Sequence, residues 1–131
     1  MTKQLLATRK RLRDDFAFWA KHCCKIRTKS GEIKPLVLNK VQERFLTEHV
    51  IPQMETVGYV RSVILKGRQQ GLSTVVSAYI YWRVSQHKGQ KGLVVAHVAD
   101  STETLFGMYQ RTHENVPELL RPDTKYSSKK E

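Results

Sequence analysis

The sequence predicts an α/β fold with a parallel sheet, and three observations carry that prediction. The segment 59–65 ends in a continuous run of Val, Ile and Leu, which is typical of a strand buried in a parallel sheet. A polar loop with two glycines follows, and apolar residues then recur at helical spacing over 73–86. A second apolar run at 93–98 leads into another helical pattern. The order strand, loop, helix, strand, helix is typical of βαβ units, and two parallel strands indicate only the opening part of an α/β domain.

The first predicted element is a basic helix from Lys3 to about Lys21, in which apolar residues such as Leu12 and Trp19 recur among many cations. The whole chain shares this basic character. Its 131 residues carry 23 Lys and Arg against 12 Asp and Glu, a net charge of +11. That excess favours a polyanionic partner such as nucleic acid, nucleotide phosphates or an acidic membrane surface. The length is that of one domain.

The next segment is typical of a β-hairpin, with strands at 24–28 and 33–38 around a short turn. Pro35 has no amide hydrogen to give to a ladder, so we expect the second strand at a sheet edge. Asn39 is a predicted N-cap for the helix that follows, and we expect Pro52 to end that helix.

The helix predicted over 73–86 carries Val76, Ile80 and Val84 on one face, which we expect to be buried. The last residues, 121–131, are polar enough for a disordered tail. No apolar run approaches the roughly 18 residues that a membrane span requires. The two cysteines are adjacent and cannot form a disulfide framework, which favours a reducing compartment.

The polar loop between the strand and helix of the βαβ unit has the features of a phosphate site. Glycines let the backbone approach an anion, the helix N-terminus favours its charge, and a hydroxyl in the first turn can serve Mg²⁺. The standard pattern G-x-x-x-x-G-K-[ST] fails here, because Leu72 stands in place of the lysine and Lys66 in place of the first glycine. Lys66 and Arg68 are alternative cations for the β/γ-phosphates. The alternative interpretation is a plain helix start with a glycine turn and incidental surface cations.

The loop resembles the amino-terminal ATPase region of tailed-phage terminase large subunits, the motors that pump viral DNA into procapsids. Members often carry Arg-Gln-x-Gly-x-Ser/Thr, and this chain has it at 68–73; some have a deviant Walker A with the lysine at the start of the loop, where Lys66 stands. The preceding segment 33–42 also resembles the family, in which a glutamine matching Gln42 recognises adenine. The resemblance covers about 24–120, following the basic helix at about 1–23, and includes the run at 92–97.

The resemblance implies a P-loop NTPase-type parallel sheet core, incomplete in this chain, with ATP and Mg²⁺ as ligands. It also implies double-stranded DNA, a small terminase subunit and a portal as partners, in the cytoplasm of a bacterial host that carries the phage or prophage. The nucleotide-binding residues that it predicts, with Ser73 as the metal contact, are Gln42, Lys66, Gly67, Arg68, Gln69, Gln70, Gly71, Leu72, Ser73 and Thr74. Gln42 has a second interpretation, since it falls at the N3 position of the helix that Asn39 caps.

The family's Walker B segment, its coupling motif and its nuclease carboxylates have no counterpart in this sequence. Asp100 and Glu103 follow the second predicted strand, but their spacing predicts the capped start of a helix. Phosphoryl transfer needs positioned metal and water besides a phosphate cradle. We therefore expect this chain alone to be inactive as an ATPase, with no catalytic residue assigned, and to be a piece of a motor or a truncated prophage product.

Two other groups of residues have weaker interpretations. His22, Cys23 and Cys24 lack the spacing of a structural zinc site, so we expect both cysteines to be buried as small hydrophobes. The basic residues of the first helix and the hairpin predict either a contact with DNA phosphates or a solvated face; they are Lys3, Arg9, Lys10, Arg11, Arg13, Lys25, Arg27 and Lys29. Alternative functions are another helicase-like P-loop ATPase and a small basic DNA-binding or interaction protein.

Overall fold

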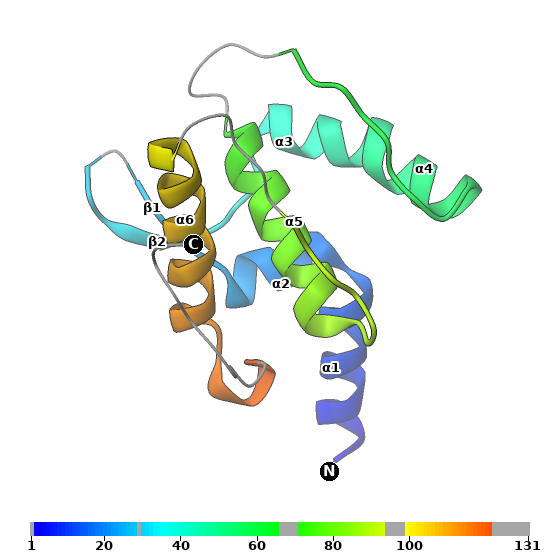
Figure 1. Cartoon of the computed structure of the whole chain (residues 1–131). Helices are drawn as coiled ribbons and strands as arrows, with labels where there is room; N and C mark the ends of the chain where they lie inside the picture. The colour runs from blue at the N-terminus through cyan, green and yellow to red at the C-terminus, as the bar shows by residue number, and fades with distance from the viewer. Residues whose placement is uncertain (1, 29, 66–70, 94–98, 122–131) are drawn as a thin grey trace. The chain divides into compact units, whose positions relative to one another are not determined.

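The structure is a computed structural model that describes residues 2–28, 30–65, 71–93 and 99–121 (Figure 1). Its chain divides into two compact units. The first unit comprises Met1–Val37 and Ser77–Glu131, and the second unit comprises Leu38–Val76. None of the helices described is long and apolar enough to cross a membrane.

The first unit begins with two helices where the sequence predicts one. α1 spans Lys3–Asp14 and α2 spans Phe16–Cys23, so the predicted extent is confirmed with a break at Asp15. Asp15 has an extended backbone, and its carboxylate accepts a hydrogen bond of 3.1 Å from the N–H of Phe18. A short acceptor at this position favours a helix start, which explains why the chain restarts there.

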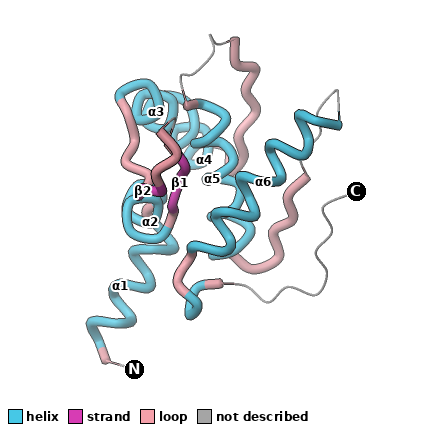
Figure 2. Tube along the Cα trace, turned by 90° about the vertical axis from the view of Figure 1, so that its left-hand side faces the viewer, coloured by secondary structure: helices cyan, strands magenta, loops and turns pink. Residues whose placement is uncertain are grey.

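The predicted hairpin is confirmed. β1 (Lys25–Arg27) pairs antiparallel with β2 (Ile33–Pro35), and Ile26 lies opposite Lys34. Gly31 lies in the turn with φ +84°, a conformation that glycine adopts without steric cost. Figure 2 draws strands in magenta, and in the described part of the chain only these two segments have that colour.

The second unit contains a helix that continues through Pro52, so the prediction that this proline ends the helix is wrong. α3 (Lys40–Phe45), a π-helical turn (Leu46–Val50) and α4 (Ile51–Thr56) follow one another without a break. The N–H of Ile51 bonds the carbonyl of Leu46, five residues back. This wider turn relaxes the ladder just before the proline, which itself lies in the first turn of α4, where no N–H is required.

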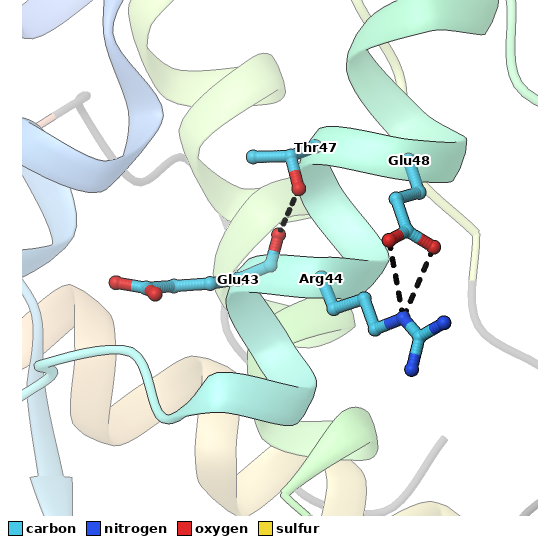
Figure 3. Close-up of polar contacts among 4 residues, drawn as sticks. All are labelled: Glu43, Arg44, Thr47 and Glu48. Carbon is cyan, nitrogen blue, oxygen red and sulfur yellow. Dashed lines mark hydrogen bonds and ion pairs between the residues drawn. The ribbon is translucent and has the colours of Figure 1, made fainter.

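Figure 3 shows two local contacts at the junction of α3 and the π-helical turn. The hydroxyl of Thr47 donates to the carbonyl of Glu43 at 2.9 Å. The Nε of Arg44 lies 3.1 Å from both carboxylate oxygens of Glu48, one turn further on. Both Arg44 and Glu48 are exposed, so this ion pair contributes little to stability.

Two long helices complete the described elements. α5 spans Leu72–Gln86, which confirms the predicted helix, and α6 spans Ala99–Asn115, starting one residue before the predicted capping residue Asp100. A 3₁₀ turn at Glu118–Leu120 follows. The buried face of α5 differs from the predicted one: it carries Leu72, Val75, Ala78 and Trp82, whereas Val84 is exposed and Val76 and Ile80 are half-buried.

An aromatic cluster forms the core of the first unit. Phe16 and Trp19 of α2 contact Tyr79, Tyr81 and Trp82 of α5, with ring centroids 5.2–6.1 Å apart. The indole N–H of Trp82 donates to the carbonyl of Leu12 at 2.8 Å, which fixes α5 to α1. Burial of such large rings and their edge contacts are the main source of stability in this unit.

The segment 59–65 is not a strand in the structure, in contrast to its predicted role. Val63 and Leu65 are fully exposed, and Tyr59 is half exposed. A central strand requires hydrogen-bonded neighbours, and the second predicted strand lies at 94–98 outside the described residues, apart from Leu93, which is exposed and has no strand geometry. The described residues contain one sheet, the antiparallel hairpin. The parallel sheet of the α/β fold therefore stays a prediction.

Candidate functional site

The predicted nucleotide site falls partly on described residues. Lys66, Gly67, Arg68, Gln69 and Gln70 lie outside them. The remaining predicted residues belong to the second unit, at the start of α3 and the start of α5, and they are Gln42, Gly71, Leu72, Ser73 and Thr74.

Gly71 begins α5 in a left-handed backbone conformation, with φ +76°. Its carbonyl accepts the first helical hydrogen bond, from the N–H of Val75 at 3.1 Å. In any α-helix that starts this way, the N–H groups of the first residues point out of the helix end, where they attract anions. The glycine and the helix start thus have the geometry that the phosphate prediction requires.

Gln42 is buried, with 4% of its surface exposed, and its amide makes contacts at both ends. Its Oε1 accepts from the N–H of Asn39 at 2.9 Å, and Asn39 Oδ1 accepts from the N–H of Gln42 at 2.9 Å. This reciprocal pair is a capping box, so the capping interpretation of Gln42 is confirmed. Adenine recognition by the same side chain stays a prediction.

The other end of the Gln42 amide joins two parts of the motif that are 29 residues apart. Nε2 donates to the carbonyl of Gly71 at 2.8 Å. A Cβ on residue 71 would lie only 2.6 Å from that Nε2, so a side chain there would displace the amide. Glycine is therefore required at 71 for two reasons, its positive φ and the close approach of Gln42. We call the contact between Gln42 and Gly71 the amide clamp.

The first turn of α5 separates its side chains by environment. Leu72, which occupies the Walker lysine position, is buried and lines a groove of about 570 Å³ with Val41, Phe45 and Ile64. Ser73 is exposed, so its hydroxyl is accessible beside the helix start. In the described part of the chain, no three His, Cys, Asp or Glu side chains gather into a metal site. Ser73 therefore suits a metal ion that arrives with a nucleotide rather than a resident one.

A second candidate site, an open basic cleft of about 1000 Å³, lies within the first unit. α1 supplies one wall, and the end of α5 with the loop after it supplies another. The lining residues that carry charge or can titrate are Arg9, Lys10, Arg13, Asp14, Arg83, His87, Lys88 and Arg121. Sequence reasoning singled out the three α1 cations but missed Arg83, His87, Lys88 and Arg121, because no local pattern predicts that the end of α5 lies beside α1.

The cleft is electrostatically positive. Its one carboxylate, Asp14, is bonded to the Nε of Arg13 at 3.1 Å, and this hydrogen bond lowers the pKa of Asp14. Burial lowers the pKa of His87, and the positive charge of Arg83 lowers it further. His87 is therefore driven toward its neutral form by its surroundings, as expected where cations gather.

The other predicted basic residues do not share one face with the cleft. Arg11 lies over the ring of Phe18 at 3.9 Å, and Lys25 and Arg27 lie on the hairpin. Lys3 begins α1 and does not line the cleft, and Lys29 lies outside the described residues. A cation over an aromatic face is already partly satisfied, so Arg11 is a weaker candidate for a phosphate contact.

Both cysteines are buried and free, which confirms their expected packing role. Burial raises the pKa of the Cys24 thiol to about 11, so this group remains protonated at neutral pH. A protonated, buried thiol is neither a nucleophile nor a metal ligand.

Comparison with known protein families and with curated proteins finds no match for this chain.

Proposed function

We propose that this chain is the ATP-binding part of a DNA-packaging motor of the phage terminase large-subunit type. The amide clamp is the observation that supports this proposal. It joins Gln42, the predicted adenine contact, to Gly71, the last glycine of the predicted phosphate loop, through a buried bond of 2.8 Å. Two segments that a nucleotide must touch at opposite ends, the base and the phosphates, are thereby held together in one unit.

Each residue has a stated role in the proposal. Lys66 binds the β/γ-phosphates, with Arg68 as the alternative cation, and the N–H groups of 67–73 surround the phosphate oxygens. Ser73 contributes its hydroxyl to the Mg²⁺ that accompanies ATP. Gln42 selects adenine through the amide positions that its capping and clamp bonds leave over, since an amide group has four such positions in all.

The rest of the proposal extends to the complete motor. Segments 59–65 and 93–98 become parallel strands of a P-loop sheet when further strands pair with them, and the exposed apolar side chains of Val63 and Leu65 are then covered. ATP hydrolysis drives translocation of double-stranded DNA, with a small terminase subunit and a portal as partners in the cytoplasm of the bacterial host. The chain by itself binds nucleotide without turning it over, because the sequence offers no Walker B pair.

Two other functions compete with this one. A helicase-like P-loop ATPase would share the upstream glutamine and the glycine loop. A small basic DNA-binding protein is favoured by one observation, the positive cleft of the first unit, and would use the glycine loop only as a turn. Affinity for DNA with no response to nucleotide would select the last function.

Calorimetric titration with Mg·ATP and Mg·GTP tests the proposal. We expect the native chain to bind Mg·ATP in preference to Mg·GTP, and Lys66→Ala to weaken binding at least tenfold, about 1.4 kcal/mol. Lys34→Ala is the matched control, since Lys34 lies on the hairpin in an exposed pair with Glu32. Equal loss in both variants, or no heat from a chain whose circular dichroism shows it to be folded, contradicts nucleotide binding.

Gln42→Glu separates the two roles of this side chain. Glutamate at N3 keeps the acceptor for the N–H of Asn39, but it places an oxygen where the amide donated to the carbonyl of Gly71. We expect the adenine preference to disappear in this variant while helical content persists. An unchanged ATP-to-GTP ratio would remove Gln42 from the proposed site and leave it a purely structural residue.

A further inference from the structure

The basic cleft of the first unit plays no part in nucleotide binding as proposed above. We infer that this cleft, between α1 and the end of α5, binds the phosphate backbone of double-stranded nucleic acid. The inference deepens the proposed function by giving its DNA partner a site, but it rests on the first unit alone and stands if nucleotide binding fails.

Charge is the first argument. Six cations line the cleft, Arg9, Lys10, Arg13, Arg83, Lys88 and Arg121, against the single carboxylate of Asp14. That carboxylate is already paired with Arg13. No carboxylate among the described residues pairs with the other five cations. Cations gathered without anions repel one another, and a polyanion in the cleft relieves that repulsion.

The walls of the cleft are held in place by bonds that do not involve its free cations. The Trp82 indole bonds the Leu12 carbonyl at 2.8 Å, joining α5 to α1. On the far side, Arg121 donates to the carbonyls of Glu114 and Val116 at 2.8 and 3.1 Å, which fixes the chain after α6. Arg9 and Arg13 are four residues apart on α1 and therefore lie on the same side of the helix. A site whose walls are fixed before binding loses less entropy when its ligand arrives.

The residue types favour nucleic acid over an acidic protein. Four of the six cations are arginines, whose planar guanidinium matches phosphate oxygens in a two-pronged contact. A protein partner requires apolar or aromatic anchors at the centre of the interface, and the described lining has only Leu6 and Leu120 as large apolar residues. Polar and strongly positive surfaces are typical of protein–DNA interfaces.

The lining also favours a duplex over a single strand. Proteins that bind single strands present aromatic platforms on which successive bases stack. The described lining contains no Phe, Tyr or Trp, and the first unit's aromatic rings pack in its core instead. The contacts that the cleft can make are with phosphates, so binding is expected to be independent of sequence and sensitive to salt.

Fluorescence anisotropy with a labelled DNA duplex, without nucleotide, tests the inference. The test variant is Arg9→Gln, Arg83→Gln and Lys88→Gln combined, and the matched control is Lys3→Gln, Lys25→Gln and Arg27→Gln combined, which removes the same charge outside the cleft. We expect the test variant to lose affinity at least tenfold and to flatten the plot of log K against log salt by about 2–3, at roughly 0.9 per lost phosphate contact. The control should change both quantities by much less.

Three results would overturn the inference. They are equal losses in the test and control variants, displacement of the duplex by an oligoglutamate of the same charge, and binding of the corresponding single strand as tightly as the duplex. Circular dichroism monitors folding, and the double variant of the exposed residues, Arg9→Gln with Lys88→Gln, repeats the test if the half-buried Arg83 proves necessary for stability. A Lys66→Ala chain that loses nucleotide but keeps DNA binding separates this inference from the proposed function.

Discussion

The two units of the molecule bury their apolar residues to different extents. In the first unit, Phe16, Trp19 and Trp82 are buried and contact one another or neighbouring rings. In the second unit, the buried side chains are smaller, and they are Gln42, Leu46, Val50, Leu72 and Val75. The same unit leaves Val63 and Leu65 fully exposed in one extended segment.

This difference teaches that the first unit is completed by its own residues and that the second unit offers an apolar surface without a described partner. Isolated apolar residues on a surface are ordinary, but alternate ones along an extended segment are typical of a strand that another strand or helix covers. The amide clamp is the exception in the second unit, because it is a buried and well-connected contact. The first unit is therefore expected to dominate stability, while the second carries the predicted nucleotide residues.

Replacing Trp19 tests the largest side of this comparison. Trp19→Ala removes a ring that has no exposed surface, so we expect a loss of about 3–5 kcal/mol in the free energy of unfolding, measured by urea denaturation. The matched change in the second unit, Val63→Ala, should stay within about 0.5 kcal/mol. A similar loss at both positions would mean that Val63 is covered in solution.

Trp19→Phe refines the same measurement. The indole nitrogen of Trp19 is buried and has no hydrogen-bond partner among the described residues. Phenylalanine removes that unsatisfied donor while keeping most of the ring, so this variant should lose much less stability than Trp19→Ala.

Alanine at Gly71 examines the amide clamp, with Gly58 as the control. Both glycines have a positive φ and belong to the second unit, but a Cβ at Gly58 meets nothing within 4 Å. We expect Gly58→Ala to cost about 1–2 kcal/mol from backbone strain. Gly71→Ala should cost about 1–3 kcal/mol more, the penalty for a buried amide that loses its partner. Equal losses in thermal or urea unfolding would show that the clamp contributes nothing.

The smallest effect is expected on the surface of the second unit. Glu48→Gln removes the exposed ion pair with Arg44 and should change the free energy of unfolding by less than about 0.5 kcal/mol. The change should shrink further in 1 M salt, because salt screens exposed charges. A loss above 1 kcal/mol would mean that this helix face is packed against another surface.

The sequence predicted the local elements well because their signals are local. Asn39 and Gln42 announce a capping box by spacing alone, and Gly31 with its polar neighbours predicts the hairpin turn. The break at Asp15 and the helix through Pro52 were missed, because an acceptor inside a long pattern and a π-helical turn leave no distinct sequence signal.

Long-range features were predicted less completely. The buried face of α5 was misassigned because Val84 is as apolar as Val75, and only contact with α2 decides which ring of residues faces inward. The bond between Gln42 and Gly71 joins two residues that the sequence had marked separately for nucleotide binding. The basic cleft depends on Trp82 meeting the carbonyl of Leu12, 70 residues away, which no periodicity encodes.

The π-helical turn has a consequence for the phase of the helix that contains it. Relative to a plain α-helix, such a turn acts as a one-residue insertion, and each residue advances a helix by about 100°. Every side chain of α4 is therefore rotated by about that angle against the register set by Asn39 at the start of α3. Deleting a single residue between Leu46 and Val50 would restore the uninterrupted register and turn Met54 and its neighbours to a different side of the helix.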